Sequence, residues 1–207
     1  MPFHLKPNRS TKATVYPLID QDKALRNAFL GPIWRGEKVD KDILNRKPDP
    51  YVVECAKGQD ISPIWGGAVF PWHIDEEVRN LIEGLEPGRH NFIPIRVRLK
   101  DAMTDERPFY LLHVTTALRG SIIIEKTRFA DGIGKTEITG GGQLSASGPI
   151  VLKSSMIEGH HLWRGGIGKY GGGGDPFAFD YFCSDEFFER MKPHKKALVE
   201  FHRCEVQ

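Results

Sequence analysis

The run of residues 92–100 alternates apolar and polar side chains, and it restricts the fold of this 207-residue chain more than any other stretch. Successive side chains of a β-strand point to opposite faces, so the alternation predicts a strand with one buried face. Pro94 has no amide hydrogen to donate, which favours an edge position or the start of the strand. The side chains expected to point inward are Ile93, Ile95, Val97 and Leu99.

Two short helices are predicted beside such strands. Asp75 can cap a helix that begins with two glutamates and is stopped by Pro87. Ser184 can cap a second helix that begins with Asp-Glu and is stopped by Pro193. A side-chain oxygen at the cap and acidic residues in the first turn both stabilise the positive end of a helix.

Other segments have the apolar content of strands. Residues 109–118 are expected in the centre of a sheet, with residues 122–126 as the hairpin neighbour of that strand. Further strands are expected at residues 51–55, 149–153, 156–163, 177–183 and 197–206. The fold class that follows is α+β: a mostly antiparallel sheet with a few short helices packed on it, and an irregular N-terminal subregion.

Residues 70–97 and 179–206 present the same signals in the same order. Each has an aromatic segment, a capping residue, two acids, a short helix, a proline and a strand. The spans from Asp75 to Val97 and from Ser184 to Val206 are equally long. Sequence identity between the two segments is too low to indicate a repeat, so similar local physics is our interpretation.

Residues 1–60 are polar and rich in proline, and we predict that they form the irregular N-terminal subregion. A helix is expected at about residues 20–30, and a short helical turn at residues 40–45. Apolar side chains such as Phe29 and Trp34 need cover, so this subregion is expected to pack on the α+β domain of residues 61–207.

Charge and cysteine content exclude several classes of protein. Lys and Arg total 29 against 27 Asp and Glu, for a formal net charge of +2, with no basic cluster typical of nucleic-acid binding. The three cysteines are far apart, which favours reduced thiols in the cytoplasm. We expect neither a signal peptide nor a membrane span. No feature indicates a homo-oligomer.

Most of the 22 glycines lie between Gly132 and Gly174. Gly166, Gly168 and Gly171 match the dinucleotide-binding spacing GxGxxG, which needs a preceding strand and a helix that starts inside the motif. Here further glycines, Asp and Pro follow, and they cannot begin a helix. A flexible loop over residues 165–174 is therefore favoured. A small hydrolase or nucleotide-binding enzyme that uses this loop, or a structural partner in a secretion system, remains an alternative.

No group of residues forms a recognisable catalytic or metal site. His160 and His161 would point to opposite faces of a strand, so one buried and one exposed histidine is expected rather than a metal pair. Ser145 and Ser147 lack the glycine spacing of a nucleophile elbow. Cys183 is interpreted as a core cysteine. The prediction is therefore no catalytic residue, no metal and no cofactor.

Three residues around the glycine loop are of the types that anchor protein interfaces: Trp163, Arg164 and Tyr170. We predict that they contribute to binding a partner protein. The competing interpretation is that Trp163 closes the core at the end of a strand.

Four blocks of the sequence resemble the signature of one bacterial family, and they lie at residues 88–95, 109–114, 157–164 and 182–187. This family is that of polymorphic-toxin immunity proteins with a myxobacterial prototype, first catalogued as an uncharacterised domain. The order and spacing agree over about residues 65–206. Departures are Trp163, where Phe is common, and Asp75, where Ser often caps the helix. The resemblance implies a cytoplasmic, non-enzymatic protein that neutralises a cognate toxin in interbacterial competition.

Overall fold

The computed structural model describes residues 1–7, 16–17, 52–55, 64–65, 72–99, 104–129, 132–133, 147–166, 180–194 and 199–207. The chain divides into two compact units. Unit 1 comprises Met1–Lys6, Val114–Pro193 and Val199–Gln207, and unit 2 comprises Pro7–His113 and His194–Leu198. Most of residues 1–60, including the helices expected at 20–30 and 40–45, lies outside the described residues. The predicted N-terminal subregion therefore stays a prediction.

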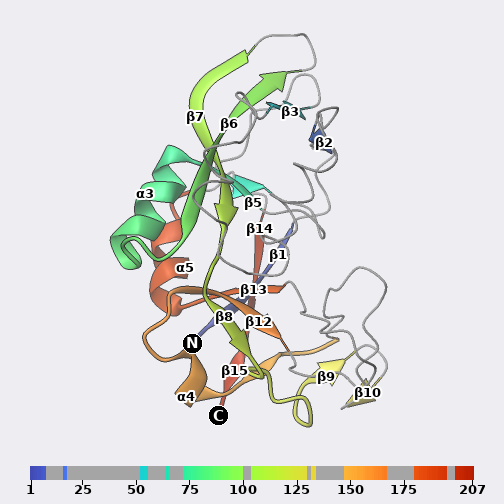
Figure 1. The fold of residues 1–207 in the computed structure, drawn as a ribbon. Helices are drawn as coiled ribbons and strands as arrows, with labels where there is room; N and C mark the ends of the chain where they lie inside the picture. The colour runs from blue at the N-terminus through green and yellow to red at the C-terminus, as the bar shows by residue number, and fades with distance from the viewer. Residues whose placement is uncertain are drawn as a thin grey trace. The chain divides into compact units, whose positions relative to one another are not determined.

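Unit 2 contains a six-stranded sheet in the order β2-β3-β6-β7-β5-β4 (Figure 1). Its strands are β2 (Tyr16–Pro17), β3 (Val52–Cys55), β4 (Ile64–Trp65), β5 (Trp72–Asp75), β6 (Asn91–Leu99) and β7 (Thr104–His113). Strand β7 is antiparallel to both of its neighbours, β5 and β6, whereas β3 is parallel to β6.

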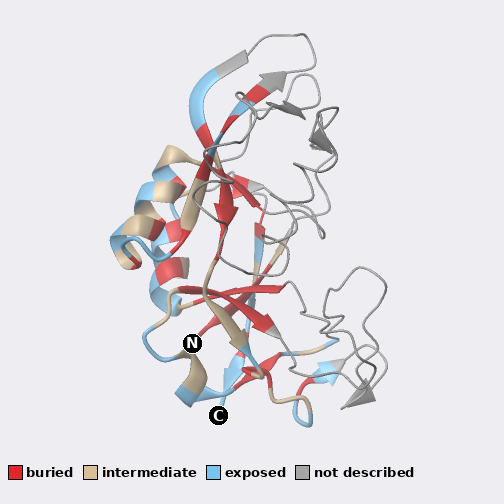
Figure 2. Ribbon diagram, viewed as in Figure 1, coloured by how far each residue is buried: buried red, intermediate tan, exposed pale blue. Residues whose placement is uncertain are grey.

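The alternating run is confirmed as β6, with Ile93, Ile95 and Val97 buried and the residues between them exposed (Figure 2). Strand β6 is internal to the sheet. Its pairing with β3 begins only at Arg96, however, and Pro94 is paired with Tyr110 of β7 on the other side. The missing amide hydrogen of Pro94 is tolerated because, among the described residues, no strand pairs with β6 on the β3 side at that point.

Helix α3 (Glu76–Leu85) confirms the first predicted helix. The amide of Val78 donates to Oδ1 of Asp75 at 3.0 Å, which is the expected N-cap. Val78 and Ile82 are buried one turn apart, so the apolar stripe of the helix faces the sheet.

Unit 1 contains a five-stranded sheet in the order β14-β1-β13-β12-β8, and two two-stranded sheets, β10-β9 and β11-β15. The strands are β1 (Phe3–Pro7), β8 (Ala117–Arg119), β9 (Arg128–Phe129), β10 (Gly132–Ile133), β11 (Val151–Leu152), β12 (Leu162–Gly166), β13 (Asp180–Cys183), β14 (Val199–Arg203) and β15 (Glu205–Val206). Strand β13 is antiparallel to β1 and β12, whereas β8 is parallel to β12.

Helices α4 (Ser154–Ile157) and α5 (Asp185–Met191) belong to unit 1. In α5 the amide of Phe187 donates to Oγ of Ser184 at 3.1 Å, so the second predicted helix and its cap are confirmed. Phe187 and Met191 are buried. Phe188 stacks on Phe3 of β1 with the ring centroids 4.1 Å apart, which holds the helix against the sheet.

Several predicted strand limits were wrong. The strand expected at 109–118 is divided, because β7 ends at His113 and the chain joins the other sheet at Ala117. The hairpin expected at 122–126 is absent. Gly120 turns the chain with φ +74°, and Ile122 then bridges Leu152 of β11. The segment at 156–163 begins as helix α4, and the closing strand at 197–206 divides into β14 and β15.

The observed architecture is α+β with strands dominating, as predicted. Each unit places a strand–helix–strand segment around a third strand. In unit 2, β5 and β6 flank β7, and in unit 1, β13 and β14 flank β1. In unit 2, where β7 is antiparallel to both flanking strands, this arrangement is the split βαβ pattern. The two segments are the ones that share their order of sequence signals.

Candidate functional site

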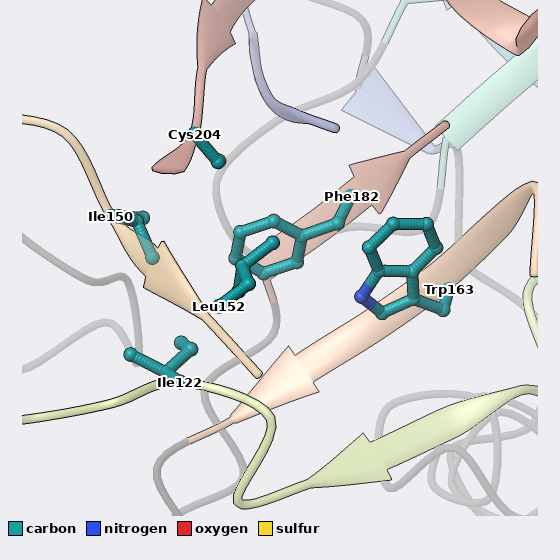
Figure 3. Packing of buried hydrophobic residues seen from close by; sticks show 6 residues of the cluster. All are labelled: Ile122, Ile150, Leu152, Trp163, Phe182 and Cys204. Atoms are coloured by element: carbon teal, nitrogen blue, oxygen red, sulfur yellow. The ribbon is translucent and has the colours of Figure 1, made fainter. Parts of the chain in front are cut away.

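Trp163 lies in the core of unit 1. Only 1% of its surface is exposed, and its ring stacks on that of Phe182 at 6.0 Å (Figure 3). The surrounding buried cluster consists of Ile122, Ile150, Leu152, Trp163, Phe182 and Cys204. The structure therefore matches the interpretation in which Trp163 closes the core.

Gly165 is required by the same packing. A Cβ atom at this position would lie 2.4 Å from Cε2 of Phe182, closer than real contacts allow. Gly165 and Gly166 belong to β12, so the prediction that they belong to a loop was wrong. A glycine inside a strand often marks such a close approach, and here the Phe182 ring fills the space that a side chain would occupy. Residues 167–179 lie outside the described residues.

Arg164 is buried beside Tyr181, its partner in the register of β12 and β13. Its backbone amide donates to the carbonyl of Thr116 at 2.9 Å. Burial lowers the pKa of the Arg164 guanidinium, an effect that Tyr181 partly opposes. Burial likewise raises the pKa of Tyr181. Both changes follow from the cost of placing charge in a poorly solvated interior.

The three predicted partner-binding residues therefore differ in position. Trp163 and Arg164 are buried within unit 1, and Tyr170 lies outside the described residues. Their role in partner binding stays a prediction.

His161 and Ser184 form a polar contact that resembles part of a catalytic triad. Nδ1 of His161 lies 2.9 Å from Oγ of Ser184 and 3.8 Å from Oε2 of Glu186. Both contacts use the same ring nitrogen, so the imidazole does not bridge the serine and the acid as a triad histidine does. Oγ of Ser184 also accepts the Phe187 amide as the helix cap. These contacts stabilise the N-terminus of α5.

The histidine pair differs from the sequence expectation. His160 and His161 are both partly exposed, and they lie between α4 and β12 rather than within a strand. The expectation of one buried and one exposed histidine was therefore wrong. Among the described residues, no group of His, Cys, Asp or Glu side chains has the arrangement of a metal site.

Cys183 and Cys204 are buried free thiols, which confirms Cys183 as a core residue. Burial raises the pKa of Cys183 well above its usual value, and it raises the pKa of Cys204 to about 12. The thiolate is the nucleophilic form of cysteine, so neither residue has the chemistry of an activated nucleophile. Ser147 is exposed at the start of a described segment, and Ser145 lies outside the described residues.

Sequence reasoning missed a small cleft in unit 1. Its volume is about 220 Å³, and the residues that line it are His4, Lys6, Ser147, Gly148, Ile150, His202, Arg203 and Cys204. His4 and Lys6 are two apart on β1 and so share one face of the strand. That spacing, together with His202 near the chain end, was the available signal. Only the fold brings these two strands together.

No helix among the described residues is long and apolar enough to cross a bilayer. The polar side chains described above stabilise helix ends. Ser184 and His161 lie at the N-terminus of α5, and Asp75 caps α3.

A family model for immunity proteins matches residues 40–206, which is most of the chain. The protein therefore belongs to the immunity protein family Imm11. A search of curated proteins gave no match.

Proposed function

We propose that this protein binds a cognate toxin in the cytoplasm of the cell that produces both, and that it neutralises the toxin without catalysing a reaction. Membership of the Imm11 family over residues 40–206 carries this proposal. The described polar groups support it. Ser184 and His161 are used at a helix end, and the buried thiols are held in their neutral form.

Neutralisation by binding requires occlusion: the immunity protein covers the active site of the toxin or holds the toxin in an inactive conformation. Such a complex needs a few well-packed anchors and complementary charge. The net charge of +2 is too small to select a partner by long-range attraction, so local groups must provide the charge complementarity.

Co-expression with the toxic domain encoded beside this chain tests the proposal. Cells that make both proteins are expected to grow, and the pair is expected to elute as one complex in size-exclusion chromatography. Phe182→Ala is the negative control, because losing this fully buried ring costs about 3–5 kcal/mol of stability. Absence of both protection and complex formation with the wild-type chain would contradict the proposal.

We also propose Trp163, Arg164 and Tyr170 as contributors to toxin binding. Alanine at each position is expected to weaken the complex, as measured by calorimetry. Because Trp163 and Arg164 are buried, their variants need a parallel measurement of folding by circular dichroism. Unchanged affinity in all three folded variants would remove these residues from the interface.

A further inference from the structure

Strand β14 lies at one edge of the five-stranded sheet of unit 1, beside β1. Among the described residues, no strand pairs with β14 on its outer side, the side away from β1. An edge strand presents unpaired amide and carbonyl groups with which a strand of another chain can pair. Short edge strands and prolines reduce this tendency. The opposite edge, β8, has only three residues, whereas β14 has five and contains no proline.

Two hydrogen bonds just beyond β14 show which of its backbone groups point outward. The Cys204 amide donates to the Pro2 carbonyl at 2.9 Å, on the side of β1. The next amide, that of Glu205, donates to the Ile150 carbonyl at 2.9 Å, on the side of β11. The amides of successive residues in a strand point to opposite sides. The amides and carbonyls of Val199 and Phe201 therefore point to the outer side, as the Glu205 amide does.

The outer side already pairs with a strand farther along the chain. Strand β15 is parallel to β11, with Val151 opposite Glu205. Strand β11 begins at Val151, so this pairing does not extend along β14. The C-terminal segment thus has a partner strand on its outer side at 205–206 and, among the described residues, none at 199–203.

Contacts on the side of α5 hold β14 in its extended conformation. The Phe201 ring packs edge-on against Phe188 of α5 with the centroids 5.1 Å apart, and against Phe3 of β1 at 6.4 Å. The guanidinium of Arg203 lies over the Phe3 ring at 5.8 Å. A strand that is ordered before binding loses less conformational entropy in a complex than a free loop does.

The side chains of β14 indicate the chemistry of a strand that would fit beside it. On one face, Oε2 of Glu200 lies 3.2 Å from Nε2 of His202, so these two groups complement each other. Phe201 and Arg203 share the other face, because residues two apart in a strand point the same way. Phe201 is partly exposed, and Arg203 is exposed without an acidic partner among the described residues.

We propose that the outer side of β14 pairs with an extended strand of the toxin, which places an apolar side chain beside Phe201 and an Asp or Glu beside Arg203. The proposal rests on the proposed function. In such strand addition, main-chain hydrogen bonds provide affinity and the side chains provide specificity. A second copy of this chain fits less well. Its own β14 offers only Val199 and Phe201, and no acid, on the face that contains Arg203.

Residue-resolved amide hydrogen exchange tests the inference on the full chain, alone and bound to the toxic domain encoded beside it. The Val199 and Phe201 amides are expected to exchange fast in the free protein and to slow about tenfold or more in the complex. The amides of Glu200 and His202 point toward β1 and are the internal control, expected to be protected in both states. A complex without added protection at Val199 and Phe201 would overturn the inference.

Exchange in the free protein also tests the alternative occupant. Protection of the Val199 and Phe201 amides that grows with protein concentration would show a second copy at this edge, and would overturn the inference. Absence of a complex with the wild-type chain would reject the proposed function, and this inference with it. A complex that forms without edge protection rejects the inference alone.

A matched pair of variants tests the outward amide of β14. Phe201→Pro and Phe201→Val both remove the aromatic ring, but only the proline variant loses the amide hydrogen. Proline is tolerated in an edge strand where the amide faces solvent, and circular dichroism checks that both variants fold. The proline variant is expected to bind the toxin about tenfold more weakly than the valine variant. Equal affinity of two folded variants would contradict strand pairing at Phe201.

A charge reversal tests the acid expected beside Arg203. Arg203→Glu is expected to weaken toxin binding about tenfold, and the loss should shrink as salt is raised. The matched control is Arg190→Glu on α5, where the wild-type arginine already pairs with Glu186. This control is expected to bind like the wild type. Equal affinity of Arg203→Glu and Arg190→Glu would overturn the placement of an acid at this position.

Discussion

The two units of this protein use the same local pattern and complete it differently. In each, a strand leads through a side-chain cap into a short helix and on to a second strand. The cap oxygen of Asp75 accepts a hydrogen bond from the amide three residues later, and that of Ser184 does the same. In each sheet the two strands of the segment flank a third strand.

The source of this third strand separates the two units. In unit 2 it is β7, which follows the segment directly in the sequence. In unit 1 it is β1, which comes from the opposite end of the chain. Unit 2 can therefore pair its central strands after closing a short loop, whereas unit 1 must bring together distant parts of the chain. Loop closure costs more entropy as the loop lengthens. The local pattern thus specifies a strand–helix–strand segment without specifying the strand that completes it.

The largest effect is expected from removing a core leucine in the third strand of each unit. Leu5 of β1 and Leu111 of β7 are both buried, so Leu5→Ala and Leu111→Ala should each cost about 2–5 kcal/mol. Amide hydrogen exchange is expected to show the loss in β12 and β13 for Leu5→Ala, and in β5 and β6 for Leu111→Ala. Equal loss of exchange protection in both units in either variant would show that the two units unfold together, and would contradict the difference drawn between them.

A smaller loss of stability is expected from a substitution at Gly165. This residue lies in β12, which pairs with β13 on the side away from β1. Gly165→Ala forces the added methyl group against the Phe182 ring and should lower the free energy of unfolding by about 1–3 kcal/mol. The matched control is Gly148→Ala, whose added Cβ would meet the Arg128 side chain at an ordinary 3.4 Å. Urea denaturation measures both. Equal stability of the two variants would contradict the close packing of Phe182 on β12.

The smallest loss of stability is expected from changing a helix cap, and the pH dependence of that loss distinguishes the two caps. Ser184→Ala should cost about 1 kcal/mol, independently of pH in the acid range. Asp75 differs, because burial raises the pKa of its carboxyl above 3.8 despite the opposing hydrogen bond from the Val78 amide. The unfolded chain then loses this proton first, so the carboxyl destabilises the fold progressively as pH rises from about 3.8 through the folded pKa.

Asp75→Asn keeps an oxygen that can accept from Val78 and removes the charge. Its stability relative to wild type is therefore expected to improve as pH rises through that window. Thermal unfolding at a series of pH values measures the difference. If the stability difference between Asp75→Asn and wild type stays constant with pH, or shifts in favour of wild type as pH rises, burial is not the dominant influence on the pKa of Asp75.

Much of the fold was accessible to sequence reasoning because it depends on neighbouring residues. The alternation in β6 and the caps of α3 and α5 involve side chains within a few positions of one another, and all were predicted. Segment 109–118 failed for the opposite reason. It is apolar throughout, and its periodicity cannot show that the chain leaves one sheet at His113 and enters another at Ala117.

The candidate site shows the same division. Trp163 and Arg164 were selected as interface residue types, yet their place in the core depends on the pairing of β12 with β13 and on Phe182 packing over Gly165. The cleft lined by His4, Lys6 and His202 depends on two strands from opposite ends of the chain.

The sequence by itself determined the strand–helix–strand segments, their caps and the class of protein, because short-range sterics, hydrogen bonds and the order of apolar blocks carry that information. Only the tertiary structure decided which strand completes each sheet and which side chains are buried. Those properties arise from contacts between residues far apart in the chain, and local periodicity contains no record of them.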